Sequence, residues 1–297
     1  MADIQKAVRL ANGAEMPTIG YGTWQVENSP AGADAVAEAI KAGYRHIDGA
    51  ARYENEVSVG EGIRKSGIAR EELFVTSKVL FTHRSYDKVL SACDTTLKDL
   101  GLEYLDLYLI HWPAVANNYA NWEEVNAETW RAMEKIYREG KARAIGVSNF
   151  LTHHLEPLMK TAEIVPMVNQ IEFRPGYPQI ECAEWCMERG IVPEAWRPLG
   201  AGTALTGELM TELSKKYGKT PAQICLRWVL QHGLTPLVKS ANPVRMRENL
   251  DVYDFALSEE DMVKIAELIH LAATDYENSA DKIREEVNAI CAKCPIY

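Results

Sequence analysis

Two kinds of segment alternate along almost the whole of this chain. Short apolar runs, typical of buried strands, occupy residues 18–23, 44–48, 73–78, 104–111, 142–148, 167–171, 191–196 and 235–239. Segments with apolar residues at helical spacing separate them, at 31–42, 55–66, 85–100, 123–139, 150–163, 179–189, 208–231 (as two helices) and 243–251. Such alternation predicts parallel strands joined by helices. Eight strands in 297 residues favour a single (β/α)₈-barrel domain, a TIM barrel, over residues 1–297.

Additions to the barrel are expected at both ends of the chain. Asn12-Gly13 stands between residues 8–10 and 15–17 and is a strong signal for a β-hairpin with a tight turn, which would cap the barrel bottom. Further C-terminal helices are expected at 258–272 and 281–291. Pro193 falls inside a predicted strand, so we expect a bulge or a strand start there.

Composition excludes several classes of protein. The formal net charge is -10 and no basic cluster stands out, so no nucleic-acid partner is expected. No segment approaches the ~20 apolar residues of a membrane helix, and no signal peptide is evident. The six cysteines are scattered, unlike a disulfide framework, and we interpret Cys291-x-x-Cys294 as two incidental thiols. We therefore predict a cytoplasmic protein with no membrane partner and no metal.

Polar residues of the predicted strands gather at the carboxyl ends of those strands. Asp48 ends the second strand and Tyr53 follows it, Lys78 ends the third, and His111 ends the fourth. Taken singly, each residue has a purely structural interpretation. Lys78 could be a solvated lysine, His111 a core histidine, Asp48 an N-cap and Tyr53 a surface tyrosine. Together they lie at the one face where barrel enzymes carry their active sites, so we predict a site there.

Several motifs occur in order along the chain. They are Gly43-Tyr44-Arg45-His46-Ile47-Asp48, Tyr53-Glu54-Asn55-Glu56, Thr76-Ser77-Lys78, Leu107-Tyr108-Leu109-Ile110-His111-Trp112-Pro113, Ile145-Gly146-Val147-Ser148-Asn149-Phe150, Val168-Asn169-Gln170-Ile171-Glu172, and Lys239-Ser240 with Arg245, Glu248 and Asn249. This set resembles the aldo-keto reductase family, above all bacterial members similar to 2,5-diketo-D-gluconate reductase. The resemblance runs from Gly20 to about Met262.

The resemblance implies NADPH-dependent reduction of an aldehyde or ketone, with a catalytic tetrad of Asp48, Tyr53, Lys78 and His111. The chemistry agrees, because hydride transfer to a carbonyl carbon leaves charge on the oxygen, which needs a donor such as Tyr53. Lys78, held by Asp48, would lower the pKa of Tyr53 from its ordinary ~10. His111 would orient the carbonyl oxygen. Part of the family has glutamate there and reduces double bonds, so histidine favours carbonyl reduction.

The cofactor site is expected at the end of the barrel sequence, because no Gly-x-Gly-x-x-Gly motif follows a predicted strand. Asn242 as N-cap and Pro243 at the first position would begin a helix whose free N–H groups attract a phosphate. By resemblance, NADPH/NADP⁺ would contact Gly22, Thr23, Trp24, Ser148, Asn149, Gln170, Trp196, Arg197, Leu199, Gly200, Lys239, Ser240, Arg245, Glu248 and Asn249.

The roles within that set differ. The resemblance places Lys239, Ser240 and Arg245 at the 2′-phosphate and stacks Trp196 on the nicotinamide. Arg197 stands where the family usually has a small residue, and we hypothesise that it reaches the pyrophosphate. A substrate pocket is expected from Trp24, Tyr53, His111 and Trp112, and residues 271–297 form a tail that is a candidate cover for it.

Two other functions stay open at this point. One is an NADPH-binding protein on the same fold that does no catalysis or acts in regulation, since fold does not fix function. The other is an isomerase or lyase that uses Lys78 as a Schiff-base amine. The partner of the reductase would be a small-molecule carbonyl substrate, and the family's habit predicts a monomer.

Overall fold

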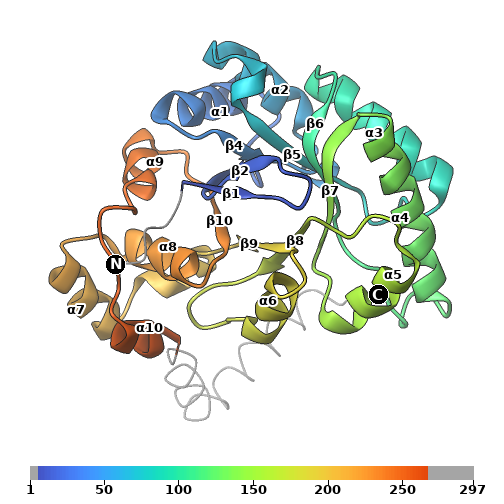
Figure 1. The fold of residues 1–297 in the computed structure, drawn as a ribbon. Helices are drawn as coiled ribbons and strands as arrows, with labels where there is room; N and C mark the ends of the chain where they lie inside the picture. Colours follow the sequence, from blue (N-terminus) through green and yellow to red (C-terminus); the bar gives the residue numbers. More distant parts are fainter. Residues whose placement is uncertain (1–5, 267–297) are drawn as a thin grey trace, which may run out of the picture.

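The computed structural model describes residues 6–266, so the predicted helix 281–291, the tail 271–297, Cys291 and Cys294 lie outside the described residues. Eight parallel strands close into a barrel in the order β10-β3-β4-β5-β6-β7-β8-β9, as the prediction requires (Figure 1). They are β3 (Gly20–Gly22), β4 (His46–Asp48), β5 (Phe74–Val79), β6 (Leu105–Ile110), β7 (Ala142–Ser148), β8 (Val168–Glu172), β9 (Val192–Trp196) and β10 (Thr235–Val238).

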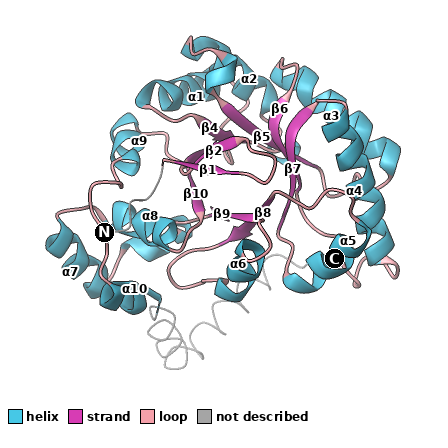
Figure 2. Cartoon of the chain, viewed as in Figure 1, coloured by secondary structure: helices cyan, strands magenta, loops and turns pink. Residues whose placement is uncertain are grey.

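Helices surround this barrel on its outside (Figure 2). They are α1 (Pro30–Ala42), α2 (Glu56–Ser66), α3 (Tyr86–Leu100), α4 (Trp122–Arg138), α5 (Thr152–Thr161), α6 (Ile180–Met187), α7 (Glu208–Tyr217), α8 (Pro221–Gln231), α9 (Pro243–Leu250) and α10 (Glu259–Ala266), with short 3₁₀ helices η1 (Ala51–Tyr53), η2 (Arg70–Glu72) and η3 (Gly200–Leu205). The α-helices α1 to α9 lie within a few residues of their predicted ranges, whereas the 3₁₀ helices were not predicted. The predicted helix 258–272 begins as α10, and its residues beyond 266 are outside the described part.

The predicted hairpin is present, and it closes with a β-turn in which the Gly13 N–H donates to Leu10 O at 2.8 Å. The turn is not of the primed type, because Asn12 does not take a positive φ. Strands β1 (Ala7–Arg9) and β2 (Glu15–Pro17) pair antiparallel and are joined by residues 10–14. Gly13 takes a φ of 88°, and the Leu10 N–H donates to Ala14 O across the loop. The hairpin is held to the barrel by packing, because Leu10 and Met16 are buried in one cluster with Phe74, Leu107 and Leu109. The hairpin lies across the barrel in Figure 1 and closes its amino end.

Pro193 lies near the start of β9, as expected. The Val192 N–H donates to Met167 O on the β8 side, so the nitrogen of the next residue faces β10. Pairing between β9 and β10 begins only at Glu194, opposite Thr235. The N–H that proline lacks is therefore not needed by the sheet at this point.

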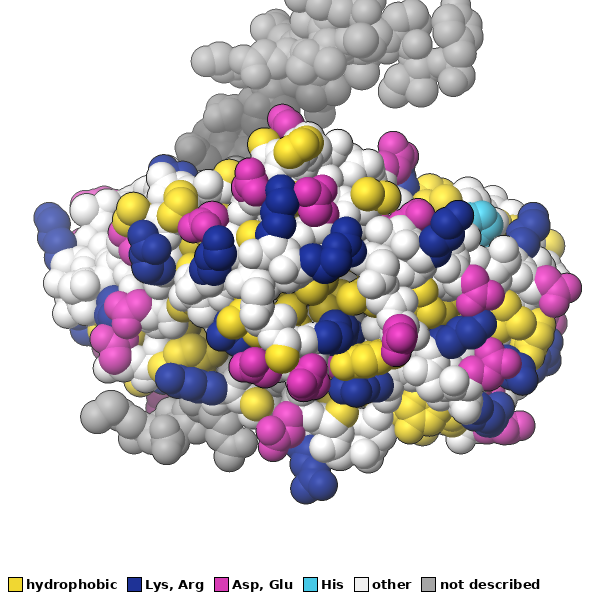
Figure 3. Space-filling view, turned by 90° about the horizontal axis from the view of Figure 1, so that it is seen from above, with side chains coloured by type: hydrophobic (Ala, Val, Ile, Leu, Met, Phe, Trp, Pro, Cys, Tyr) yellow, Lys and Arg dark blue, Asp and Glu magenta, His cyan; other side chains and the backbone are white. Residues whose placement is uncertain are grey.

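The outer surface carries charges of both signs. On the face seen in Figure 3, Lys and Arg side chains are intermixed with Asp and Glu rather than gathered in one field. Within residues 6–266, no helix has the length and apolar character needed to cross a membrane. In the same part of the chain, no cluster of three or more His, Cys, Asp or Glu could hold a metal ion.

Candidate active site

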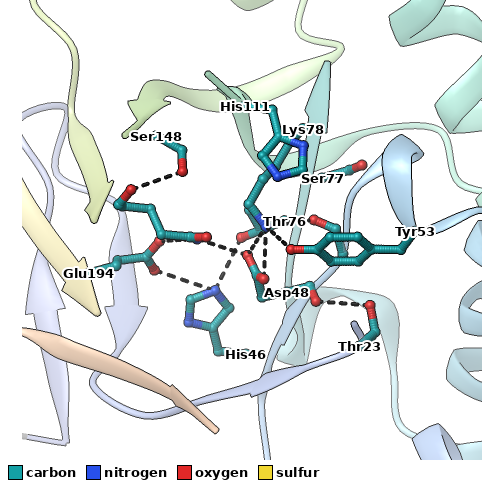
Figure 4. Close-up of polar contacts among 12 residues, drawn as sticks. Thr23, His46, Asp48, Tyr53, Thr76, Ser77, Lys78, His111, Ser148 and Glu194 are labelled. Atoms are coloured by element: carbon teal, nitrogen blue, oxygen red, sulfur yellow. Dashed lines mark hydrogen bonds and ion pairs between the residues drawn. The ribbon is translucent and has the colours of Figure 1, made fainter. Parts of the chain in front are cut away.

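Lys78 lies at the centre of the predicted tetrad. Its Nζ donates to both carboxylate oxygens of Asp48, at 2.7 and 2.8 Å, and to Gly49 O at 2.9 Å. The Tyr53 hydroxyl lies 3.5 Å from the same nitrogen. The His111 ring packs edge-on against the Tyr53 ring, with centroids 5.8 Å apart. The structure thus brings all four predicted residues together (Figure 4).

Buried polar anchors fix the loop that carries Tyr53. Tyr53 ends η1, just after β4, and Asn55 follows it. The buried Asn55 amide donates to Thr23 O and Val26 O, both at 2.8 Å. Glu56 at the start of α2 accepts a 2.6 Å bond from Ser77 of β5, beside Lys78. These contacts tie the loop to two strands and hold the phenol over the barrel mouth.

Burial dominates the acidity of the two proton-bearing rings. The pKa of Tyr53 is raised above its ordinary value by burial, while the charge and hydrogen bond of Lys78 oppose the rise. Lys78 therefore lowers the pKa of Tyr53, as predicted, but burial raises that pKa by more, so the net value lies above the ordinary one. Burial, and then the charges of Lys78, Arg52 and Arg84, lower the pKa of His111 to about 3. At neutral pH both rings are uncharged, and Tyr53 holds its proton.

Lys78 keeps its charge in spite of complete burial. Burial lowers the pKa of Lys78, but Asp48 and Tyr53 outweigh that effect and the net pKa is raised. The Lys78 ammonium donates to both Asp48 oxygens and to Gly49 O, and at the longer distance of 3.5 Å to the Tyr53 hydroxyl. A Schiff-base amine must be neutral to attack a carbonyl, so this environment disfavours that alternative.

A second layer of polar groups lies beneath the tetrad. The Gln170 amide nitrogen donates to Asp48 Oδ1 at 2.9 Å and to Glu194 Oε2 at 3.0 Å. Glu194 is fully buried on β9 and faces His46 Nε2 at 3.6 Å. Burial, and then the Asp48 charge, raises the pKa of Glu194 to about 8, and burial lowers that of His46 to about 4. Both are neutral near pH 7, so Asp48 and Lys78 remain the only charged pair in this layer.

A cavity of about 590 Å³ opens above the tetrad. It is lined by Asp48, Tyr53 and His111, and by the predicted substrate residues Trp24 and Trp112. Other predicted residues in its lining are Gly22, Ser148, Asn149, Gln170, Trp196, Arg197, Leu199 and Lys239. Trp24 and Trp112 are 58% and 46% exposed, so both stand at the mouth. Thr23 is buried away from it and donates to Asp48 O, and Gly200 is also absent from the lining.

Asn149 and Trp196 hold each other at the side of this cavity. Asn149 has a left-handed φ of 63°, which turns its side chain back over the end of β7. Its amide donates to His111 O at 2.9 Å and to Ser148 Oγ at 3.0 Å. The Trp196 indole donates to Asn149 Oδ1 at 2.9 Å. The indole plane is thereby fixed by a residue at the end of β7, which is separated from β9 by β8.

A second cavity of about 800 Å³ adjoins the first. Leu199, Leu205 and Lys239 line both, so the two cavities lie side by side, and we refer to them together as the cleft. The predicted residues Ser240, Arg245, Glu248 and Asn249 line the far part, together with Thr220, Pro221 and Ala222. Lys239 and Arg245 are exposed, whereas Asn249 is buried and hydrogen-bonds Tyr44.

The expectation of free N–H groups at the start of α9 is wrong. Asn242 is the N-cap, as predicted, and Pro243 is the first helical residue. However, Asn242 Oδ1 accepts from the Val244 N–H at 2.8 Å and the Arg245 N–H at 3.3 Å. The Asn242 N–H itself donates to Ser240 Oγ at 3.1 Å. The cap that starts the helix takes up its amides, so an anion here depends on side chains.

Three residues beside the tetrad were missed from the sequence. Arg52 and Phe81 line the first cavity, and Glu194 lies beneath it. Arg52 directly precedes Tyr53, so its place at the site was available from the motif. A glutamate inside an otherwise apolar strand was an equal signal for Glu194, because a buried carboxyl needs a partner.

The family model described as "Aldo/keto reductase family" matches residues 18–270 of the chain. Among curated proteins, glyoxal reductase of Bacillus subtilis is 50% identical over 262 residues, covering 88% of this chain and 92% of that protein. The 9,11-endoperoxide prostaglandin H2 reductase of Trypanosoma cruzi is 47% identical, covering 88% and 90%.

Solved structures agree with these relatives. An aldo/keto reductase of Brucella melitensis superimposes with a TM-score of 0.82 at 43% identity, covering 88% of this chain and 98% of that one. A Bombyx mori aldo-keto reductase in complex with NADP gives 0.80 at 35% identity, covering 88% and 92%.

Proposed function

The chain belongs to the aldo/keto reductase family, and from this premise we propose that it reduces an aldehyde or ketone to an alcohol with NADPH, Tyr53 giving the proton. One observation carries the proposal for the site residues. The Tyr53 hydroxyl lies 3.5 Å from an ammonium that is itself fixed by Asp48, at the floor of a cavity large enough for a small carbonyl compound.

The cleft supports the cofactor assignment. Its two adjoining cavities join the tetrad to Lys239 and Arg245, which are two cations without an ion-pair partner among the described residues. A dinucleotide with a phosphate at its adenosine end suits such an elongated cleft, and guanidinium groups match phosphate geometry. Lys239, Ser240 and Arg245 would hold that phosphate, Glu248 and Asn249 the adenine end, and Ser148, Asn149, Gln170 and Trp196 the nicotinamide end. NADPH, when bound, supplies the hydride.

The side chains of the tetrad then supply one proton to the carbonyl oxygen and stabilise the negative charge that develops on Tyr53. Tyr53 donates its hydroxyl proton to the carbonyl oxygen, which becomes the alcohol oxygen. The ammonium of Lys78 stabilises the tyrosinate left behind, and Asp48 keeps that ammonium charged and in place. Neutral His111, edge-on to Tyr53, orients the carbonyl oxygen by a hydrogen bond. The indole of Trp196 supplies a flat surface for a ring at the cavity side.

NADPH oxidation by wild type and Tyr53→Phe, with a panel of aldehydes and ketones, tests the proposal. We expect wild type to turn over and the phenylalanine variant to lose ~10²-fold or more in kcat, because the general acid is gone. Its NADPH affinity should stay close to wild type. Full activity in Tyr53→Phe would remove Tyr53 as the donor.

The same experiment addresses the non-catalytic alternative. If the wild type binds NADPH tightly and reduces none of the carbonyl compounds, the chain is a binding protein on this fold. The intact tetrad argues for turnover. Monomeric state and cytoplasmic location stay predictions from the sequence.

A further inference from the structure

Arg52 is a cation on the substrate side of the cleft that the proposed mechanism does not use. It is the residue before Tyr53 in η1, and it lines the same cavity as Tyr53 and His111. The other cations in that lining, Arg197 and Lys239, belong to the part proposed for the cofactor. Arg52 therefore faces the space left for the substrate.

The cavity contains almost no negative charge to balance Arg52. Among its described lining residues, Asp48 is the only carboxylate, and its two oxygens are occupied by Lys78 and Gln170. Arg84, a further cation near His111, donates instead to Trp112 O and Pro113 O, so it holds the loop after β6. In a chain with a net charge of -10, this mouth is locally positive.

The guanidinium of Arg52 is free to take another partner. Among residues 6–266, its only ion pair is with Glu54 Oε1 at 3.2 Å, and the two side chains are 56% and 80% exposed. Exposed pairs of this kind contribute ~1 kcal/mol or less, so a ligand anion can replace Glu54 at little cost. Nearby, Trp24, Phe81 and Trp112 form an apolar wall that a bound substrate would share with Arg52.

We infer that Arg52 selects carbonyl substrates that carry a carboxylate, pairing with that group while Tyr53 and His111 engage the carbonyl oxygen. The inference rests on the proposed function and narrows it to a substrate class. A guanidinium matches a carboxylate in a planar, two-point contact, and the aromatic wall accommodates the carbon skeleton between the two polar ends. The contact is remote from the reacting carbon, so it binds ground state and transition state alike and acts on KM.

Two aldehydes of nearly equal shape test this inference. 4-Carboxybenzaldehyde carries the anion, and methyl 4-formylbenzoate is its neutral ester. For wild type we expect a higher kcat/KM with the acid. Arg52→Gln should lower kcat/KM for the acid about tenfold, through KM, and leave the ester within about twofold, since a charge-assisted hydrogen bond at a half-exposed site is lost.

Three further variants sharpen the result. Arg52→Lys keeps the charge and should restore part of the preference. Glu54→Gln removes the competing carboxylate and should lower KM for the acid. Arg131→Gln, on the exposed face of α4 and outside the cavity lining, removes one cation without touching the site and should change neither substrate.

The outcomes separate the two proposals. Activity on the ester shows that a variant is folded and that carbonyl reduction holds. If Arg52→Gln leaves kcat/KM for the acid and the ester at the wild-type values, or lowers both by the same factor, the proposed role of Arg52 is overturned. Carbonyl reduction itself would still hold. If wild type binds NADPH and reduces neither these aldehydes nor any other, both proposals are overturned.

Discussion

The ammonium of Lys78 is bound by both carboxylate oxygens of Asp48, and the two side chains are 0% and 4% exposed. Neither charge is therefore stabilised by solvating water. Such a pair acts as one unit, because removing either partner leaves the other as an uncompensated charge in a medium of low dielectric constant.

Asp48→Asn is expected to destabilise the fold as well as abolish reduction. It leaves Lys78 buried with a neutral partner, which costs ~3–5 kcal/mol by the usual measure of broken buried pairs. Urea unfolding followed by circular dichroism measures the loss. Glu38→Gln serves as the control, because its pair with Lys41 is exposed and should change stability by ~0.5 kcal/mol or less. Equal losses of unfolding free energy in Asp48→Asn and Glu38→Gln would show that Asp48 and Lys78 do not act as one unit.

Glu194 makes the stability of the protein depend on pH. Its folded pKa is raised to about 8 by burial, from an ordinary value of 4.5. Between these values the folded chain binds a proton that the unfolded chain has released, so the stabilisation is present at low pH and is lost as pH rises toward 8. Glu194→Gln keeps an acceptor for Gln170 and cannot ionise.

The measurement is the difference in urea midpoint between wild type and Glu194→Gln at about pH 6 and about pH 8. We expect the urea midpoint of Glu194→Gln, relative to that of wild type, to be higher at about pH 8 than at about pH 6. Because His46 and the other titrating groups are common to both proteins, their effects largely cancel in that difference. A constant difference would show that Glu194 is already ionised in the folded state.

Arg245→Ala is expected to weaken NADPH binding about tenfold and NADH binding much less, since a single charge-assisted contact to a phosphate is lost. Quenching of tryptophan fluorescence on titration gives both affinities. Arg247 lies on the same helix, is exposed and does not line the cleft, so Arg247→Ala is the matched control. An equal loss of NADPH affinity in Arg245→Ala and Arg247→Ala would indicate general electrostatic attraction rather than a specific phosphate site.

Arg197 tests the proposed reach toward the pyrophosphate. It is exposed, lines the first cavity and has a left-handed φ of 58°. Arg197→Asn removes the charge with a residue that tolerates this backbone conformation. We expect NADPH and NADH affinities to fall together, by about tenfold, because both cofactors share the pyrophosphate. Unchanged affinities would remove Arg197 from the cofactor site.

The periodicity of the sequence was enough to predict the barrel and the rim that carries its active site. Buried strands and amphipathic helices differ in apolar spacing, and the tetrad residues end three neighbouring strands or follow them directly. The Asn242 cap was also predictable, since Asn followed by Pro is a local signal. These features depend on residues close together in the chain.

Other features depend on contacts that one stretch of sequence does not contain. Leu10 of the hairpin is buried in one cluster with Phe74 and Leu107, which come much later in the chain. The pKa of Tyr53 is raised because the folded barrel removes water from it, an effect larger than the Lys78 charge. The link from Glu194 through Gln170 to Asp48 joins three strands, so no motif within one of them predicts it.

The capping of α9 by Asn242 has a consequence for how cofactor preference can change over evolution. Amides that are already bonded cannot bind a phosphate, so under the proposed assignment Lys239, Ser240 and Arg245 alone would discriminate between the two nicotinamide cofactors. A phosphate contact made by a backbone amide does not depend on which side chain is present. A contact made by a side chain can be lost or gained by a single amino-acid substitution. Lys239 and Arg245 are exposed, so their replacement leaves the barrel core untouched. Under the proposed assignment, the cofactor preference of this chain could therefore change without a loss of fold stability.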